Sequence, residues 1–279
     1  MTRSESALVG PVPAPSVHVM SWNIRRRVVL DPRPSDRWGN RAPRLGALLR
    51  AEKPTLLGAQ EALPDQANFV RSSLGANYRW VGHGRGRGNR GEGCPIFYDA
   101  DRLELLDWRQ DALSDQPSLP GSTSWGNVIP RVLVFATFRD RTTLRRFIAI
   151  NTHFDHLSAR SRVRSARAVR ELVASNSLPA VVTGDLNDHP ASGTVRELIS
   201  DGSLVDVWEM AHTRDSVSWG TLANYREPRR GRRIDWILAS PDFLVHRAAI
   251  NPLRHHGGWG SDHLPVQAVM RLPENGDTA

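Results

Sequence analysis

The sequence predicts an α/β sandwich in which two β-sheets pack face to face with helices outside them. Apolar segments rich in β-branched residues are the most frequent kind of segment, and amphipathic helical segments lie between them in both halves of the chain. The sequence contains no short-period repeat. With 279 residues and 39% hydrophobic content, the chain has ample material for a core.

We expect one domain over residues 17–272, because the candidate motifs extend from Trp22 to His263 without an obvious linker. Residues 1–16 are rich in proline and have no apolar core of signal-peptide length, so we expect a disordered N-terminal tail there. The polar residues 273–279 are expected to form a C-terminal tail.

The first half of the chain alternates strand-like and helical segments. Residues 41–53 carry leucines at helical spacing, and Pro54 ends that helix. Residues 83–93 are rich in glycine and arginine and predict a loop, while prolines at 117 and 120 predict an irregular segment over 107–126. The elements expected in this half are strands at 17–22, 55–62 and 95–99 and helices at 41–53 and 64–74.

The second half predicts more strands. Residues 131–138 and 146–152 resemble a hairpin with its turn near Asp140 and Arg141. Residues 159–174 place valines and an alanine on one helical face and arginines on another. The other elements expected here are strands at 180–186, 233–239, 244–250 and 264–271 and a short helix at 194–200.

The charge and the cysteine content of the sequence limit which partners and which cellular location we expect. A formal charge of +8 and a pI of about 10.9 would suit an anionic partner, but Lys53 is the only lysine, and an arginine bias can also come from a GC-rich genome. Cys94 is the only cysteine, so no intrachain disulfide can form, which favours a reducing, cytoplasmic location. No apolar run approaches membrane-spanning length. We expect a monomer.

Two short polar motifs follow predicted buried strands. Asp185 and Asn187 come directly after the apolar run 179–184, and Asp262 with His263 follows Gly260-Ser261. A carboxylate can accept a proton from water, and an amide two residues on can hold that water if the backbone is extended. An Asx turn is the alternative for the first motif. Together the motifs suggest metal-assisted attack on a phosphate ester.

Two further strand ends carry polar groups. Asn23 follows the first strand and is either a turn residue or an amide that holds a nucleophile or a metal-bound water. Glu61 closes an apolar strand and either faces solvent or points inward, where an unpaired charge is costly. Mg²⁺ would be a suitable partner for an inward carboxylate, since it prefers oxygen ligands.

The segment from Asn151 to His156 is unusually polar for a strand end. Alternation along an extended strand would place Asn151, His153 and Asp155 on one face, where His153 could donate to a phosphoryl oxygen. Asp155 and His156 could instead form a turn or a helix N-cap before Ser158.

Asp235 lies in an otherwise apolar strand and therefore needs a partner. The partner could be Arg232 or Arg233. It could also be a histidine ring that the carboxylate orients, as the acidic member of a catalytic triad does, and His263 is the obvious ring.

In order along residues 17–272, these motifs resemble those of the endonuclease/exonuclease/phosphatase superfamily, the DNase I-like hydrolases. The motifs are Ser21-Trp22-Asn23, Gln60-Glu61, Asn151-Thr152-His153, Gly184-Asp185-Leu186-Asn187, Arg233-Ile234-Asp235 and Ser261-Asp262-His263. The resemblance implies a four-layered α/β sandwich, with two packed, mainly antiparallel sheets flanked by helices, and a divalent-metal phosphoesterase.

The resemblance also implies roles for these residues. Glu61 would be the main Mg²⁺ ligand, with Asn23 and Asp262 close to the ion, and Mn²⁺ would be an alternative ion. Asp185 would activate the attacking water, with Asn187 beside it. The remaining catalytic positions are His153 and His263, which would stabilise the transition state, and Asp235, which would orient His263.

Other segments resemble a bacterial branch of the superfamily that is similar to deadenylase-type and sugar-phosphate phosphatase members. These segments are Gly82-His83-Gly84-Arg85 with Gly91-Glu92, residues 151–156, and Ala159-Arg160. They identify candidates for substrate selection, namely Arg85, Glu92, Asp155, His156 and Arg160.

We therefore expect an enzyme that hydrolyses a small phosphorylated metabolite, such as a sugar phosphate. A nuclease acting on DNA or RNA is the alternative, supported by eight arginines that would fit a solvated surface equally well. A catalytically inactive binding scaffold is disfavoured because every expected catalytic position is filled. The sequence shows no long apolar loop for a membrane. The eight arginines that support the nuclease alternative are Arg85, Arg87, Arg90, Arg226, Arg229, Arg230, Arg232 and Arg233.

Overall fold

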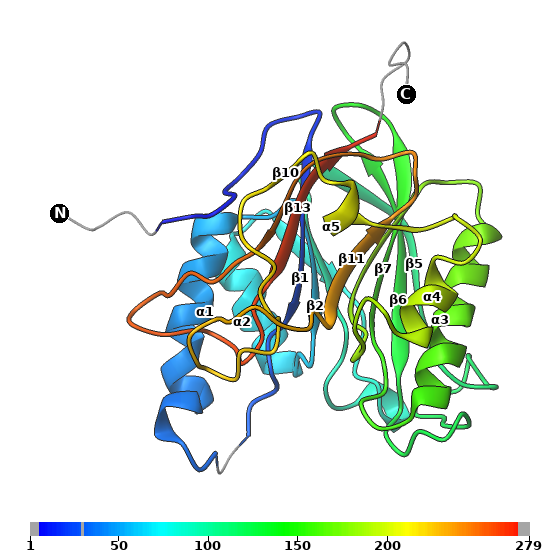
Figure 1. The fold of residues 1–279 in the computed structure, drawn as a ribbon, viewed down its shortest axis with the longest axis horizontal. Helices are drawn as coiled ribbons and strands as arrows, with labels where there is room; N and C mark the ends of the chain where they lie inside the picture. The colour runs from blue at the N-terminus through cyan, green and yellow to red at the C-terminus, as the bar shows by residue number, and fades with distance from the viewer. Residues whose placement is uncertain (1–5, 29–30, 273–279) are drawn as a thin grey trace.

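Two mixed β-sheets pack face to face, and helices cover their outer faces (Figure 1). The computed structural model describes residues 6–28 and 31–272. The helices are η1 (Pro34–Asp36), α1 (Trp38–Glu52), α2 (Pro64–Leu74), η2 (Arg87–Asn89), α3 (Ala159–Ala174), α4 (Gly193–Leu198) and α5 (Val207–Met210). The strands are β1 (Val17–Asn23), β2 (Leu56–Gln60), β3 (Tyr78–Val81), β4 (Ile96–Asp99), β5 (Leu103–Ala112), β6 (Val132–Asp140), β7 (Arg146–His153), β8 (Ala180–Asp185), β9 (Val205–Asp206), β10 (Thr213–Arg214), β11 (Asp235–Ala239), β12 (Leu244–Ile250) and β13 (Val266–Arg271).

The first sheet has the strand order β10-β12-β13-β1-β2-β4-β3, and the second has the order β5-β6-β7-β8-β11-β9. Antiparallel pairs predominate, and the parallel pairs are β1–β2, β10–β12 and β7–β8. Three hydrophobic clusters separate the layers: one lies between the sheets, one between the first sheet and α1 and α2, and one between the second sheet and α3 and α4. The predicted four-layered sandwich is therefore confirmed.

A similar β-α-β unit stands at the centre of each sheet. Helix α1 connects the parallel strands β1 and β2, and α3 connects β7 and β8. Parallel neighbours end at the same edge of a sheet, so each unit brings two strand ends together. Asn23 is paired with Gln60 in the first sheet, and His153 is paired with Asp185 in the second.

The inward face of these central strands changes from apolar to polar toward that edge. In β1 the inward residues are Val19, then Ser21 and Asn23, because side chains alternate along a strand. In β8 they are Val181, then Thr183 and Asp185. The same sandwich interior therefore holds a dry core at one end and a cluster of polar groups at the other.

A hydrogen-bonded layer separates the apolar core from the polar edge. The Gln60 side-chain amide donates to Asn151 Oδ1 at 2.7 Å, and the Thr183 hydroxyl donates to the same oxygen at 3.1 Å. Asn151 in turn donates to the carbonyls of Ala59 and Pro95 at 2.8 and 3.0 Å. These bonds join the two sheets directly, which fixes the spacing of the strand ends.

Most long predicted elements are present, but the two-residue strands β9 and β10 and two longer strands, β3 and β5, were missed. The structure forms β3 at residues 78–81, and β5 extends to Ala112 through part of the segment expected to be irregular, 107–126. Both are edge strands, and an edge strand needs only one hydrogen-bonded neighbour and can carry exposed polar side chains. Charged positions such as Asp107 and Arg109 therefore hid the strand pattern.

The prediction of a disordered tail over residues 1–16 is wrong for its second part. The backbone N–H groups of Leu8, Val9 and Gly10 donate to the buried carboxylate of Glu52 at 2.7, 3.1 and 2.9 Å. Glu52 ends α1, so this segment is bonded to the outer helix layer. Residues 1–5 and the predicted tail 273–279 lie outside the described residues.

Within residues 6–28 and 31–272, no helix is both long and apolar enough to span a bilayer.

Gly58 tests the tight contact between the sheets. A Cβ atom at this position would lie 2.0 Å from the Thr183 hydroxyl and 2.7 Å from Asn151 Oδ1. We expect Gly58→Ala to lower the free energy of unfolding by about 1–3 kcal/mol, measured by urea denaturation. Gly39→Ala is the control, since no atom lies within 4 Å of its added Cβ. Equal stability of the two variants would contradict this account of the layer.

Candidate active site

The polar strand ends meet around the side chain of Asn23. Its amide nitrogen donates to Glu61 Oε1 at 3.1 Å and to Asp185 Oδ2 at 3.0 Å. The first carboxylate follows β2 and the second ends β8, so a single amide links the catalytic candidates of the two sheets. Asn23 is buried, and its own oxygen accepts the backbone N–H of Arg25 at 2.9 Å. A simple turn at Asn23 does not account for these contacts.

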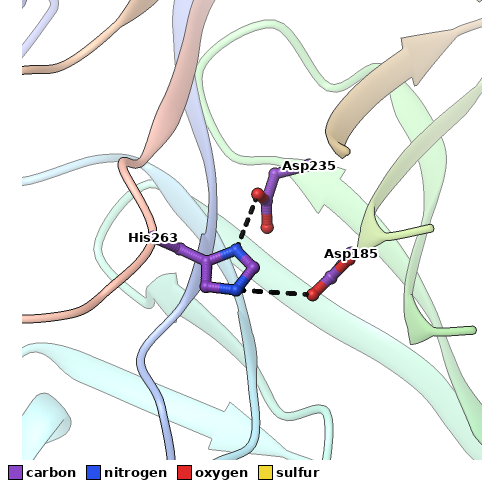
Figure 2. A group of neighbouring side chains, drawn as sticks. All are labelled: Asp185, Asp235 and His263. Carbon is purple, nitrogen blue, oxygen red and sulfur yellow. Dashed lines mark hydrogen bonds and ion pairs between the residues drawn. The ribbon is translucent and has the colours of Figure 1, made fainter. Parts of the chain in front are cut away.

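Asp185, Asp235 and His263 form a buried group at the same edge (Figure 2). His263 Nδ1 lies 2.8 Å from Asp235 Oδ2, and His263 Nε2 lies 3.9 Å from Asp185 Oδ2. Asp235 therefore has the ring as its partner. The alternative partner Arg233 instead pairs with Asp206 and stacks on Trp236.

The charges of this group determine one another. Burial and then the charge of Asp235 raise the pKa of Asp185 to about 7, against the opposing effect of His263. Burial alone would lower the pKa of His263, but the charge and hydrogen bond of Asp235, together with the charge of Asp185, raise it well above its usual value. At neutral pH the ring is cationic and faces a carboxylate that exchanges a proton readily.

Glu61 is held as an anion. Burial opposes its ionisation, but the backbone N–H of Arg26, 3.0 Å from Oε2, and the amide of Asn23 outweigh burial and lower the pKa of Glu61. The residue has a φ of 60°, in the left-handed region. Arg25 and Asn187 share this conformation, each two residues after the end of a strand. Such strained residues persist where surrounding contacts fix them.

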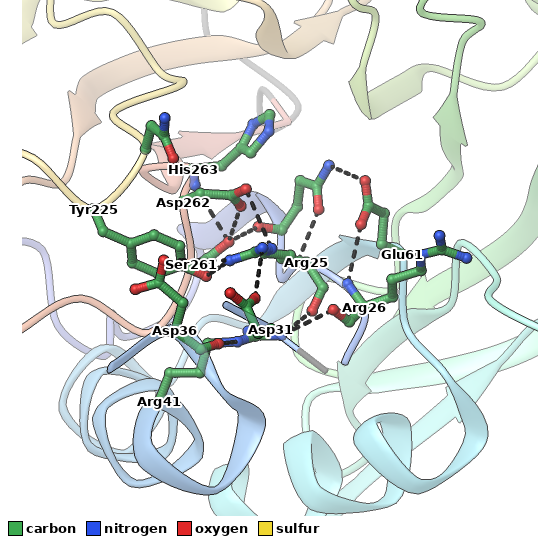
Figure 3. Close-up of polar contacts among 12 residues, drawn as sticks. Arg25, Arg26, Asp31, Asp36, Arg41, Glu61, Tyr225, Ser261, Asp262 and His263 are labelled. Carbon is green, nitrogen blue, oxygen red and sulfur yellow. Dashed lines mark hydrogen bonds and ion pairs between the residues drawn. The ribbon is translucent and has the colours of Figure 1, made fainter. Parts of the chain in front are cut away.

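Asp262 lies beside Ser261 and Arg25 in the same group of polar contacts (Figure 3). About 20% of its side chain is exposed, and its Oδ2 lies 3.6 Å from Arg25 Nε. The preceding Ser261 donates its hydroxyl to the Asn23 carbonyl at 2.6 Å. The loop before β13 is thus bonded to the end of β1.

Arg41 holds the surrounding loops together through hydrogen bonds to their backbone (Figure 3). Its buried guanidinium on α1 donates to five backbone carbonyls, which are those of Ile24, Arg25, Arg26, Asp36 and Gly260. Only a planar fork with five N–H donors can satisfy such a set. Sequence reasoning missed this residue, because an arginine at a helix start has the pattern of a solvated surface charge.

His153 lies beside Asp185 as a neutral ring. Its Nε2 is 3.6 Å from Asp185 Oδ2, and its Nδ1 is buried without a hydrogen-bond partner among the described residues. Burial, followed by the charges of Arg131 and Arg85, lowers the pKa of His153 well below its usual value. The neutral ring retains one N–H that can donate.

Asn187 does not share an extended face with Asp185, so that expectation is wrong. Strand β8 ends at Asp185, and the backbone N–H of Asn187 donates to Asp185 Oδ1 at 2.9 Å, which forms the alternative Asx turn. The Asn187 amide donates to the Phe154 carbonyl at 3.0 Å. The turn fixes one oxygen of Asp185 and leaves the other toward His153 and His263.

The expected extended placement of Asp155 is also wrong, because β7 ends at His153. Asp155 accepts the backbone N–H groups of Leu157 and Ser158 at 2.9 and 2.7 Å, as in the turn alternative, and Ser158 caps α3. Its other oxygen lies 3.3 Å from Nε of Arg131.

Arg131 is a second residue that sequence reasoning missed. It is 1% exposed, its Nη2 lies 2.9 Å from His156 Nδ1, and its Nη1 has no hydrogen-bond partner among the described residues. Arg131 lies directly before the apolar strand β6. The one sequence feature that could have pointed to it is a charged residue beside Pro130. Of the remaining candidates, Arg85 pairs with Glu92, whereas Arg160 is exposed on the first turn of α3.

Two groups of donors could hold a metal. Among the described residues, Asp185, Asp235 and His263 have donor atoms within 4.8 Å of one another. However, the ring of His263 is cationic and engaged with Asp235, and a protonated ring is a poor ligand. Glu61, Asn23 and Asp262 offer carboxylate and amide oxygens, the donors that suit Mg²⁺. This second set fits a hard divalent ion better.

Comparisons with known proteins agree with this geometry. A sequence profile described as "Endonuclease/Exonuclease/phosphatase family" matches residues 20–263. A crystal structure of a protein of that family from Bacteroides thetaiotaomicron superposes with a TM-score of 0.85 at 30% identity, covering 91% of this chain and 97% of the other. The mannosyl-6-phosphatase of Bacteroides thetaiotaomicron superposes with a TM-score of 0.85 at 29% identity, covering 91% and 99%.

A curated relative is the protein angel of Drosophila melanogaster. It is 31% identical over 180 residues, which are 61% of this chain and 49% of that protein. The chain therefore spans about half the length of this curated relative.

Arg41 provides a test of how the site is held. We expect Arg41→Lys to lower the free energy of unfolding by roughly 3 kcal/mol, because an ammonium cannot reach all five carbonyls and leaves buried acceptors unsatisfied. Urea denaturation would measure the change. Arg44→Lys, one helical turn further on and partly exposed, is the control and should change stability by less than about 0.5 kcal/mol. Similar losses in both variants would refute the special role of Arg41.

Proposed function

Since the chain belongs to the endonuclease/exonuclease/phosphatase family, we propose that it hydrolyses a phosphate ester by in-line attack of an activated water, with the help of a divalent metal ion. The observation that carries this proposal is the position of Asp185. Its carboxylate is buried between an amide donor and two histidine rings, with a pKa of about 7. A general base works best when its pKa lies near the working pH.

Each residue then has a chemical role. Asp185 accepts the proton of the attacking water, and the Asx turn with Asn187 keeps the carboxylate in position. His263, kept cationic by Asp235, donates to a phosphoryl oxygen as negative charge develops. His153 donates to the same phosphate as a neutral ring. In-line transfer needs positioning and charge neutralisation, which these groups supply.

Glu61, Asn23 and Asp262 would hold Mg²⁺ or Mn²⁺. When bound, such an ion neutralises charge on the phosphate and on the leaving oxygen. The anionic state of Glu61 supports this assignment, because a metal ligand must be deprotonated.

We propose a small phosphorylated metabolite, such as a sugar phosphate, as the substrate. The likeness to a mannosyl-6-phosphatase at 29% identity supports this choice. Arg85 pairs with Glu92, and Arg131 links Asp155 to His156, so these four residues offer polar and charged groups suited to ring hydroxyls or phosphate oxygens. Arg160, exposed on α3, would contact the outer part of a substrate. A nuclease remains the alternative because of the exposed arginines.

A phosphate-release assay tests the metal requirement and the substrate class together. The purified chain is incubated with sugar phosphates, nucleotides, single- and double-stranded nucleic acid and phospholipid head groups, each with Mg²⁺, with Mn²⁺ or with excess chelator. We expect turnover of a sugar phosphate that stops in chelator and returns with added Mg²⁺. Undiminished activity in chelator would refute the metal mechanism, and cleavage of nucleic acid alone would favour the nuclease.

The role of Asp185 is tested by Asp185→Asn, which keeps the shape of the side chain but removes the base. We expect turnover to fall by about 10²- to 10⁴-fold, measured at saturating substrate. Asp188→Asn is the matched control on the same loop. Asp188 pairs with Arg162 and Thr194, so its loss should change stability more than turnover. Near-normal turnover of Asp185→Asn would overturn the assignment.

A further inference from the structure

A cavity of about 390 Å³ is formed by the loop between β10 and β11. It lies beside the polar edge of the sandwich, the catalytic edge, which holds Asp185 and His263. Four of its lining residues are arginines, and we call it the arginine cavity. These residues are Arg226, Arg229, Arg230 and Arg232.

The four guanidinium groups have no counter-charge of their own. All are exposed, and none has an ion pair or a side-chain hydrogen bond with any described residue. The acidic residue in the lining is Glu227, and its carboxylate is paired with Arg254, outside the cavity lining. The neighbouring Arg233 behaves differently, because it is buried and paired with Asp206. The cavity therefore concentrates positive charge that the protein does not neutralise.

The loop that carries these arginines has a defined backbone. Gly220 N–H donates to the Arg229 carbonyl at 2.8 Å, and Thr221 N–H donates to the Arg232 carbonyl at 3.2 Å. Trp219 and Arg230 form an antiparallel bridge. Gly220 and Gly231 pack closely, since a Cβ on Gly220 would lie 3.3 Å from the Gly231 Cα. The arginine side chains thus project from a short, paired hairpin.

The cavity is adjacent to the catalytic residues. Ile234, in its lining, directly precedes Asp235, and Leu222, also in its lining, forms a bridge with His263. Thr221 connects the two, because its hydroxyl accepts the backbone N–H groups of Ile234 and Asp235 at 3.0 and 3.2 Å. A ligand in the cavity would therefore lie beside a substrate held at Asp185 and His263.

We propose that the arginine cavity binds a second phosphate group of the substrate while the reacting phosphate lies at Asp185 and His263. A guanidinium group can contact two phosphate oxygens at once. The four unpaired cations of the cavity carry more positive charge than one carboxylate group of a ligand could neutralise. The substrate class is thus a molecule with at least two phosphates, from a bisphosphorylated metabolite or from a nucleic acid strand. This inference rests on the proposed function, because it assumes that the first phosphate binds at the catalytic edge.

Binding measurements on the full chain test the second phosphate without relying on turnover. The Asp185→Asn background is titrated by calorimetry with a hexose bisphosphate, the matching hexose monophosphate and a single-stranded DNA of about ten nucleotides, with Mg²⁺ present. The test variant adds Arg229→Gln and Arg230→Gln. The control variant adds Arg139→Gln and Arg146→Gln, which remove the same charge from two exposed, cross-strand arginines at the opposite end of β7.

We expect at least one two-phosphate ligand to bind the background protein about tenfold or more tightly than the monophosphate, and the test variant to lose most of this preference. The control variant should keep it. Loss confined to the bisphosphate identifies a metabolite. Loss confined to DNA, with a salt dependence of log Kd shallower by about two phosphates, identifies a nucleic acid strand.

The proposal is overturned if neither two-phosphate ligand binds more tightly than the monophosphate, or if the test and control variants lose the preference equally. Should the double substitution unfold the chain, as judged by circular dichroism, Arg229→Gln and Arg230→Gln are measured singly under the same criteria. Failure of the proposed function is separate, because it would appear as absent turnover in the release assay while the binding preference stayed measurable.

Discussion

The burial of two carboxylates on adjacent strands is the constraint on which the site depends. Asp185 and Asp235 are paired in register between β8 and β11, and both are shielded from water. Two such charges repel strongly in a dry interior, so the chain must supply a cation. The ring of His263 is that cation, and it comes from the other sheet. The charge of Asp235 raises the pKa of Asp185, and the positive charge of the His263 ring opposes this effect. The two effects, together with burial, leave the pKa of Asp185 near neutral pH.

This balance requires the two sheets to be held at a fixed spacing. The core between them is apolar only over part of its length, and the layer formed by Gln60, Asn151 and Thr183 joins the sheets where the polar edge begins. Arg41 performs a similar task outside the sandwich, where it fixes the loops after β1 and before β13. Hydrogen bonds with defined directions, rather than apolar contact alone, thus position the proposed catalytic groups.

The sandwich and most long elements could be predicted, because alternating apolar patterns reflect burial. The contact of Asp235 with His263 was also predictable, since a charge in an apolar strand needs a partner. Arg41 and Arg131 could not be identified, because their buried partners are carbonyls and side chains distant in sequence. For a related reason, the Asx turn at Asn187 could be named only as an alternative to the extended strand end. An Asx turn and an extended strand end have the same local sequence, and only tertiary contacts decide between them.

The hydrogen bond from the Trp22 indole to the His263 carbonyl joins residues 241 positions apart. The proposed catalytic group therefore forms only after nearly the whole domain has been synthesised, because β13, the last strand among the described residues, pairs with β1. A nascent or truncated chain that lacks this strand cannot place His263 against Asp235. The proposed hydrolysis would therefore require the domain through β13, and contacts of such high sequence separation should make folding slow.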